Sequence, residues 1–130
     1  MKYFALAMTI AAATAGKVGD VFIGCYTDPN HPDGYRWVSF TSTIDKTGAR
    51  IGECAGSDTG KVQEWDLPAT AMQTDMADQI IIDFSSKGGP SDLAGVWDAA
   101  ADGITWSDGN TWPKTNPAWC PQNSADLFLN

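Results

Sequence analysis

Short apolar segments separated by glycine-containing turns are the feature that most constrains the fold of this chain. They are clearest in residues 83–114, where the turns are Lys87-Gly88-Gly89-Pro90, Asp102-Gly103 and Asp108-Gly109. Aspartate and glycine tolerate the positive φ angles that tight hairpin turns require. The pattern therefore predicts a compact antiparallel β-meander, in which Asp108-Gly109 closes a hairpin with Gly109 at positive φ.

The rest of the chain extends this pattern. We expect strands over residues 20–26, 35–44, 49–55, 62–67, 79–84, 93–97, 103–106 and 111–114. A loop stiffened by Pro29 and Pro32 is expected over 27–34, ending in an Asp33-Gly34 turn, and Asp45-Lys46-Thr47-Gly48 is expected to close a hairpin. One or two helical turns or an irregular loop are expected over 68–79. The predicted fold class is all-β, an antiparallel meander of about seven or eight short strands that forms a small barrel or a sandwich.

Three consecutive isoleucines mark one strand as central. Ile80, Ile81 and Ile82 form an apolar run of the kind found in strands that are covered on both faces. Alternation puts Ile80 and Ile82 on one face and Ile81 with Asp83 on the other. We therefore expect Ile80 and Ile82 to face the core and Ile81 to face outward.

The N-terminal residues resemble an export signal. Lys2 is followed by an apolar stretch over residues 3–12 and by the small-residue pattern Ala13-Thr14-Ala15. We expect residues 1–15 to be a signal peptide, with a retained N-terminal segment as the alternative. A β-meander domain would then occupy residues 16–114, and a surface tail residues 115–130.

Charge and cysteine content narrow the classes of partner. Sixteen acidic residues against eight basic ones give a formal net charge of −8, which disfavours binding to nucleic acid. Cys25, Cys54 and Cys120 predict one disulfide and one leftover thiol in an oxidising compartment, with the pairing left open. The cysteine spacing matches no zinc pattern, because no C-x-x-C occurs and His31 is the single histidine, so we predict no metal and no cofactor.

Catalytic constellations are weak. Asp83 with Asp92 or Asp98 is the best carboxylate pair for acid–base chemistry, but aspartates beside turns typically cap backbone amides. His31, between Asp28 and Asp33, would have to serve any nucleophilic triad or metal site alone. Lys87-Gly88-Gly89 lacks the order of a phosphate-binding loop. We therefore assign no catalytic residue, and the sequence favours a non-enzymatic protein while leaving an enzyme as an open alternative.

Tryptophan is abundant for a chain of this size. Six tryptophans are present, and Trp37, Trp106 and Trp112 each lie beside a predicted turn. Most tryptophans are expected in the core, but these three are candidate ligand-binding residues. Large aromatic rings of this kind stack on small aromatic or sugar-like ligands.

The motifs GCYTDPNHPDGYR, IIIDFSSKGGPSDLAGVWD and GITWSDGNTWPK together resemble a small β-rich domain of plant, algal and fungal proteins. The resemblance covers residues 20–114 and implies a shared fold without assigning an activity. Many of the plant and algal proteins are directed to plastids, so it also implies a plastid or thylakoid setting. Gly24-x-Tyr26 resembles the G-x-W motif of lipocalin-like barrels.

These observations favour a non-enzymatic binding or interaction module that is secreted or held in an organelle lumen. Its partner would be another protein or a small aromatic or sugar-like ligand. One alternative is an accessory subunit of an algal photosynthetic membrane complex, with the chain associated with that membrane assembly. A second is a carboxylate-dependent hydrolase, which requires two acids facing one cleft about 5–10 Å apart.

Overall fold

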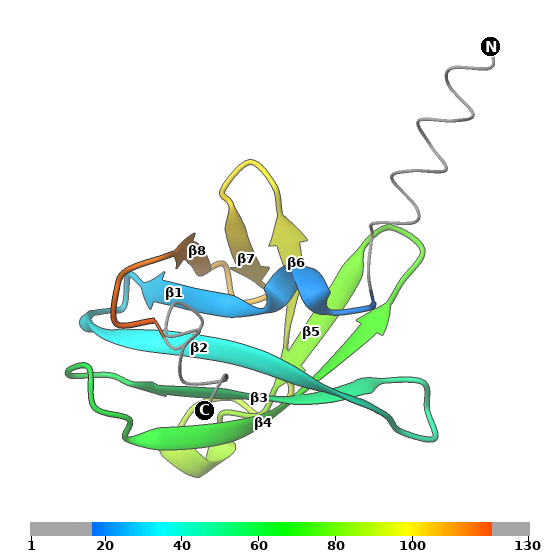
Figure 1. Cartoon of the computed structure of the whole chain (residues 1–130), viewed down its shortest axis with the longest axis horizontal. Coiled ribbons are helices and arrows are strands. Elements are labelled where there is room, and N and C mark those ends of the chain that lie inside the picture. Colours follow the sequence, from blue (N-terminus) through cyan, green and yellow to red (C-terminus); the bar gives the residue numbers. More distant parts are fainter. Residues whose placement is uncertain (1–16, 121–130) are drawn as a thin grey trace.

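The fold is a closed barrel of eight antiparallel strands that follow one another in sequence order (Figure 1). The computed structural model describes residues 17–120, so the predicted signal peptide and the end of the tail lie outside the described residues. The strands are β1 Gly24–Asp28, β2 His31–Ile44, β3 Arg50–Ser57, β4 Trp65–Gln73, β5 Asp78–Ile82, β6 Leu93–Asp98, β7 Gly103–Trp106 and β8 Thr111–Thr115. The predicted all-β meander is confirmed, and it closes as a barrel.

Helix is limited to two short 3-10 turns in the described part of the chain, η1 Asp20–Phe22 and η2 Ser85–Lys87. Between residues 17 and 120 we find no helix with the length and apolar character needed to cross a membrane. Barrel closure arises because β1 pairs with β8, aligning Cys25 with Thr115 and Tyr26 with Lys114. Closure leaves no unpaired sheet edge, so a small chain avoids edge-to-edge association.

Alternation along the strands fills the barrel interior. Register places Val38 of β2 opposite Cys54 of β3, and Cys54 opposite Leu67 of β4, and all three are buried. The apolar core continues with Phe22, Tyr26, Ala69, Ala71, Ile80, Ile82, Phe84, Ile104, Trp106 and Trp112.

The isoleucines point inward and outward as predicted, but the predicted central strand covered on both faces is wrong, because a closed barrel has no central strand. Ile80 and Ile82 are completely buried in the core, whereas Ile81 is half-buried and lies on the opposite face. Ile81 pairs with Thr70 on β4 and Ala94 on β6, so it is covered laterally by small neighbours.

Two predictions near the N-terminus are wrong. Residues 20–22 form η1 instead of the start of a strand. The predicted loop over 27–34 is a tight turn at Pro29-Asn30, in which Asp28 Oδ1 accepts the Asn30 N–H at 2.9 Å. Strand β2 then continues through Gly34, where a Cβ would lie 2.0 Å from the Ser57 carbonyl oxygen. Gly34 therefore allows close strand approach and does not form the predicted turn.

The prediction for residues 68–79 is also wrong. Strand β4 runs through Pro68 to Gln73, and β5 begins at Asp78. Proline lacks the N–H that a strand normally donates, but Pro68 still aligns with Glu53 and its carbonyl accepts the Asp83 N–H at 3.5 Å. The ladders on both sides of β4 thus override the weak local strand signal.

Glycine-containing turns behave as the sequence predicts at two hairpins. Gly109 has a φ of 93° in the β7–β8 turn, and Gly48 has a φ of 90° in the β2–β3 turn. In an up-and-down meander, alternate connections meet at the same end. The β1–β2, β3–β4, β5–β6 and β7–β8 connections therefore share one end of the barrel, which we call the mouth.

Candidate functional site

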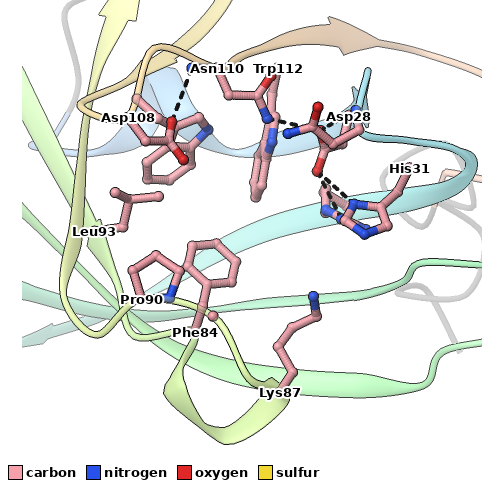
Figure 2. A pocket seen from close by; sticks show the side chains of 13 residues that line it. Asp28, His31, Phe84, Lys87, Pro90, Leu93, Asp108, Asn110 and Trp112 are labelled. Atoms are coloured by element: carbon pink, nitrogen blue, oxygen red, sulfur yellow. Dashed lines mark hydrogen bonds and ion pairs between the residues drawn. The ribbon is translucent and has the colours of Figure 1, made fainter.

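A cavity of about 160 Å³ opens at the mouth of the barrel (Figure 2). Its lining combines apolar and polar side chains from strands β1, β2, β6, β7 and β8 and from the β1–β2, β5–β6 and β7–β8 connections. The apolar lining residues are Phe84, Pro90, Leu93, Trp106 and Trp112, and the polar ones include Asp28, Asn30, His31, Arg36, Lys87, Asp108 and Asn110. This mixture of an apolar wall and a few convergent polar groups is typical of small-molecule sites.

Three aromatic rings form the apolar wall. The ring centroids of Trp106 and Trp112 lie 4.7 Å apart, and Phe84 lies 6.0 Å from each. The planes cross at 65°, 80° and 84°, so the rings meet as a corner. Gly95 faces Trp106 across β6 and β7, and a Cβ there would lie 2.8 Å from the Trp106 ring. The glycine is therefore what lets this ring occupy its place.

Arg36 is the buried charge beneath the mouth, with 1% of its surface exposed. Its Nη1 donates to the carbonyl oxygens of Ser57 and Tyr35, at 2.8 Å and 3.1 Å. Its Nη2 lies 2.9 Å from Asp28 Oδ2 and 3.0 Å from Asp58 Oδ1. The guanidinium thus joins the ends of β1, β2 and β3.

Arg36 also contacts two aromatic rings. Its guanidinium carbon lies 4.9 Å from the ring centroid of Trp65 and 5.4 Å from that of Trp112. A desolvated cation over tryptophan is stabilised by about 2 kcal/mol. The same residue therefore fixes the charged network and the position of Trp112 in the cavity wall.

Asp28 is nearly buried and is held in its ionised form. Burial alone would raise its pKa, but hydrogen bonds from Asn110 and Asn30, the contact with His31 and the charge of Arg36 outweigh that effect. The pKa of Asp28 consequently lies below its usual value. Asn110 Nδ2 donates to Asp28 Oδ1 at 2.9 Å, which ties the β7–β8 hairpin to the end of β1.

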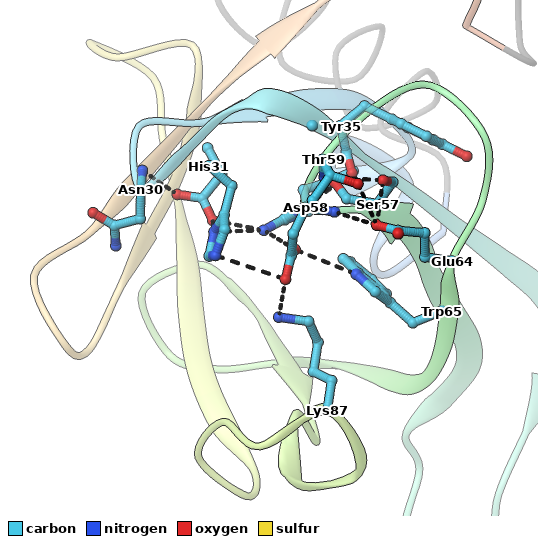
Figure 3. Close-up of polar contacts among 12 residues, drawn as sticks. Asn30, His31, Tyr35, Ser57, Asp58, Thr59, Glu64, Trp65 and Lys87 are labelled. Atoms are coloured by element: carbon cyan, nitrogen blue, oxygen red, sulfur yellow. Dashed lines mark hydrogen bonds and ion pairs between the residues drawn. The ribbon is translucent and has the colours of Figure 1, made fainter.

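Asp58 connects two loops across the mouth (Figure 3). It lies in the β3–β4 connection, and its Oδ2 is 2.9 Å from Nζ of Lys87, which ends η2 in the β5–β6 connection. Burial alone would raise the pKa of Asp58, but the hydrogen bond from Lys87 and the charges of Arg36 and Lys87 outweigh that effect. The pKa of Asp58 therefore lies below its usual value. Trp65 Nε1 also donates to Asp58 Oδ1, at 3.3 Å.

Three buried side-chain N–H groups have no acceptor among the described residues, namely Nε1 of Trp106, Nε of Arg36 and Nε1 of Trp37. Trp106 and Arg36 are lining residues of the cavity, whereas Trp37 is not. A buried donor without a partner costs about 1–3 kcal/mol. Such groups in a native fold call for an explanation, and for the two lining residues a ligand with a hydrogen-bond acceptor would supply one.

The structure separates the three candidate tryptophans. Trp106 and Trp112 line the cavity together, whereas Trp37 does not contribute to it. Trp37 alternates with the inward-facing Arg36 and Val38, and it aligns with Cys25 on the outer face. Whether a tryptophan points into or out of the barrel therefore predicts its place in the cavity better than its position beside a turn.

The cysteines are resolved into one disulfide and one thiol. Cys25 and Cys120 are bonded, which attaches the chain after β8 to the outer face of β1. Trp119 packs there against Tyr35, with ring centroids 5.0 Å apart. Cys54 is free and buried in the core, and burial raises the pKa of its thiol to about 12. A thiol of this kind is inert at neutral pH.

The carboxylates considered for acid–base chemistry lie at turns. Asp83 Oδ1 accepts the Ser85 N–H, and Asp98 Oδ1 accepts the N–H groups of Ala100 and Ala101. Neither lines the cavity, and Asp92 sits in a turn with a positive φ of 50°. Within residues 17–120, no group of three His, Cys, Asp or Glu side chains is arranged to hold a metal ion.

The charged network at the mouth, to which His31 belongs, was not predicted from the sequence. His31 Nδ1 lies 3.2 Å from Asp28 Oδ2, so its side chain belongs to the charged network of the mouth and is only partly exposed. One sequence signal was present: Arg36 shares strand parity with Val38, which marks an arginine that points inward. An inward charge in a barrel strand must be paired, and this predicts acidic partners nearby.

Comparisons of this chain with protein-family models, with curated proteins and with solved structures found no match.

Proposed function

We propose that this protein is a non-enzymatic binding module that takes a small ring-shaped molecule into the mouth of the barrel. The observation that carries the proposal is the cavity bounded by Phe84, Trp106 and Trp112, together with the buried Trp106 Nε1, which has no acceptor among residues 17–120. Aromatic walls supply apolar contact, and the orphan donor supplies a directional contact.

Cavity size supports a ligand of one ring. The volume is about 160 Å³, and an apolar cavity of about 150 Å³ is known to accommodate benzene. Larger molecules would place one ring in the cavity and the remainder in solvent, because the cavity opens at the mouth (Figure 2).

The electrostatics support binding over hydrolysis. A general acid needs a pKa raised toward neutrality. The contacts of Asp28 and Asp58 lower the pKa of each carboxyl group instead, and both carboxylates are engaged with Arg36. The same ion pairs make the mouth rigid, which reduces the ordering cost of binding.

The Cys25–Cys120 disulfide supports an exported or lumenal setting, since disulfides persist in oxidising compartments. It fastens the chain that follows β8 to the outside of the barrel. The net charge of −8 supports a ligand or partner other than nucleic acid.

A thermal-shift and calorimetry screen tests the proposal. Single-ring probes at millimolar concentration would include phenol, benzyl alcohol, indole, cyclohexanol and methyl glycosides. We expect at least one probe to raise Tm and to bind with about 1:1 stoichiometry. Trp112→Leu should abolish this binding, whereas Trp37→Leu, on the outer face, should preserve it.

A second variant protects the test against misfolding. Leu93 lines the cavity, so Leu93→Trp should fill part of the space and block the probes without removing an aromatic wall. Circular dichroism must show an unchanged barrel for each variant. Binding that persists in both Trp112→Leu and Leu93→Trp, or the failure of every probe to bind, would overturn the proposal.

A further inference from the structure

Charged side chains around the cavity are already paired with one another. Arg36 is paired with Asp28 and Asp58, and Lys87 is paired with Asp58. Among the charged lining residues in the described part of the chain, Asp108 alone has no ion pair, and it is exposed at the lip. A charged ligand would have to break a buried pair or depend on a weak exposed one. A neutral ligand leaves the network intact.

The hydrogen-bonding capacity left over is of both kinds. Trp106 Nε1 is a donor without an acceptor in residues 17–120. The Lys87 ammonium carries three hydrogens, and its contact with Asp58 uses one of them. The Asp108 carboxylate accepts the Asn110 N–H through Oδ1, and Oδ2 has no protein donor among these residues. A complementary ligand therefore presents acceptors and donors together, as hydroxyl groups do.

The aromatic wall has the shape of a corner. Phe84 is steeply inclined to both tryptophans, at 80° and 84°, and the tryptophans are inclined to each other at 65°. A flat aromatic ligand is best held in a slot between parallel faces. A saturated ring has C–H groups on its edges and faces, and it can contact all three surfaces of a corner at once.

From these three features we infer that the ligand is a neutral hydroxylated ring, namely a single pyranose unit of a sugar or the end of a glycan. This inference rests on the proposed function of the mouth cavity. The C–H groups of the sugar pack against the aromatic corner, and an inner hydroxyl accepts from Trp106 Nε1. An outer hydroxyl donates to Asp108 and another accepts from Lys87.

Saturation-transfer NMR and calorimetry with defined probes test the inference. The sugar probes are the methyl glycosides of glucose, galactose, mannose, xylose and N-acetylglucosamine, and the comparison probes are phenol and cyclohexanol. We expect at least one glycoside to bind more tightly than either comparison probe. Asp108→Ala and Lys87→Met should each weaken its binding by about tenfold, the loss of one hydrogen bond to a charged group.

Matched controls come from the opposite end of the barrel. Asp75→Ala and Lys46→Met remove the same charges from exposed turns that do not line the cavity, so the glycoside should bind both variants as it binds the native protein. Asp108→Asn keeps the acceptor for Asn110 and checks that the hairpin itself is intact. Glycoside binding that is unaffected by Asp108→Ala and Lys87→Met would overturn the inferred site.

The outcomes also separate this inference from the proposed function. If phenol or cyclohexanol binds in a Trp112-dependent manner and no glycoside binds, the pyranose inference fails while the binding function stands. If no probe of either type binds, both fail.

Discussion

Arg36 Nη2 lies 2.9 Å from Oδ2 of Asp28, and the two residues are 1% and 5% exposed, respectively. This buried ion pair joins the end of β1 to the interior face of β2 directly beneath the cavity. Because Asp28 also holds Asn110 of the β7–β8 hairpin, the pair supports the strands that carry Trp106 and Trp112. The charged network therefore holds in place the strands that carry the aromatic wall.

Removal of Arg36 should be among the most damaging changes on the polar side of the barrel. Arg36→Met leaves Asp28 buried without its counter-charge, which should cost about 3–5 kcal/mol of unfolding free energy. Arg50→Met is the matched control, because Asp20, its acidic partner, is partly exposed and can be hydrated. Urea unfolding should show a larger loss for Arg36→Met. Equal losses would contradict the assigned role of the pair.

Partial recovery should follow when both charges are removed. Asp28→Asn in the Arg36→Met background eliminates the uncompensated carboxylate, so the double variant should be more stable than the sum of the single losses predicts. Strict additivity in this double-mutant cycle would mean that the two side chains act independently.

Acid should weaken the barrel through the same carboxylates. The pKa values of Asp28 and Asp58 are lowered in the folded state, where the hydrogen bonds and charges of their partners outweigh burial. The unfolded value is about 4. These groups therefore stabilise the fold above that pH, and the contribution is lost as pH falls from about 4 through the folded-state pKa values.

The measurement is the unfolding free energy between neutral pH and about pH 2, at which carboxylates of usual pKa are protonated. Asp28→Asn and Asp58→Asn should be less stable at neutral pH and should show a flatter acid limb than the native protein. If the variant that combines Asp28→Asn and Asp58→Asn keeps the full slope of the acid limb, acid unfolding must be assigned to other carboxylates.

The sequence predicts those parts of the fold that are encoded within a few neighbouring residues. The Asp108-Gly109 and Asp45-Gly48 turns and the isoleucine strand were predictable because each is encoded within a few residues. Pro68 and Gly34 were misread because their strand conformation is imposed by neighbouring strands, through pairing with Glu53 and close approach to Ser57. Such pairings cannot be read from local propensity.

The site was less predictable than the fold. Asp28 ends β1, and Asp58, Lys87 and Asn110 lie in three different connections, so barrel closure is what brings them to one mouth. Trp106 and Trp112 were picked out by their places beside turns, but the same argument also selected Trp37, which faces outward. Closure and register, which the sequence leaves open, decide between them.

Gly109 tests the last hairpin. Its φ of 93° is strained for any residue with a side chain, and no atom lies within 4 Å of a Cβ built there. Gly109→Val should therefore cost about 1–2 kcal/mol through backbone strain alone. Gly60→Val, also in open space but without a positive φ, should cost less. Identical melting temperatures for the two variants would argue against a left-handed Gly109.

The three isoleucines of β5 should differ in their effect on stability. Ile80→Ala and Ile82→Ala remove fully buried side chains and should each cost about 2–5 kcal/mol. Ile81→Ala should cost less, because Ile81 is half-buried on the outer face. The measurement is urea unfolding with an unchanged m-value. If Ile81→Ala loses the most unfolding free energy, Ile81 and not Ile80 or Ile82 faces the core.

The most direct test of ligand binding at the mouth is the indole N–H region of the ¹H–¹⁵N spectrum, assigned with single Trp→Phe variants. The probe would be the ring compound that raises Tm most in the thermal screen. We predict a large shift of the Trp106 indole resonance, whose N–H gains an acceptor, a smaller shift for Trp112, and no shift for Trp37. A shift of Trp37 with Trp106 and Trp112 unchanged would place the ligand outside the barrel and contradict the account.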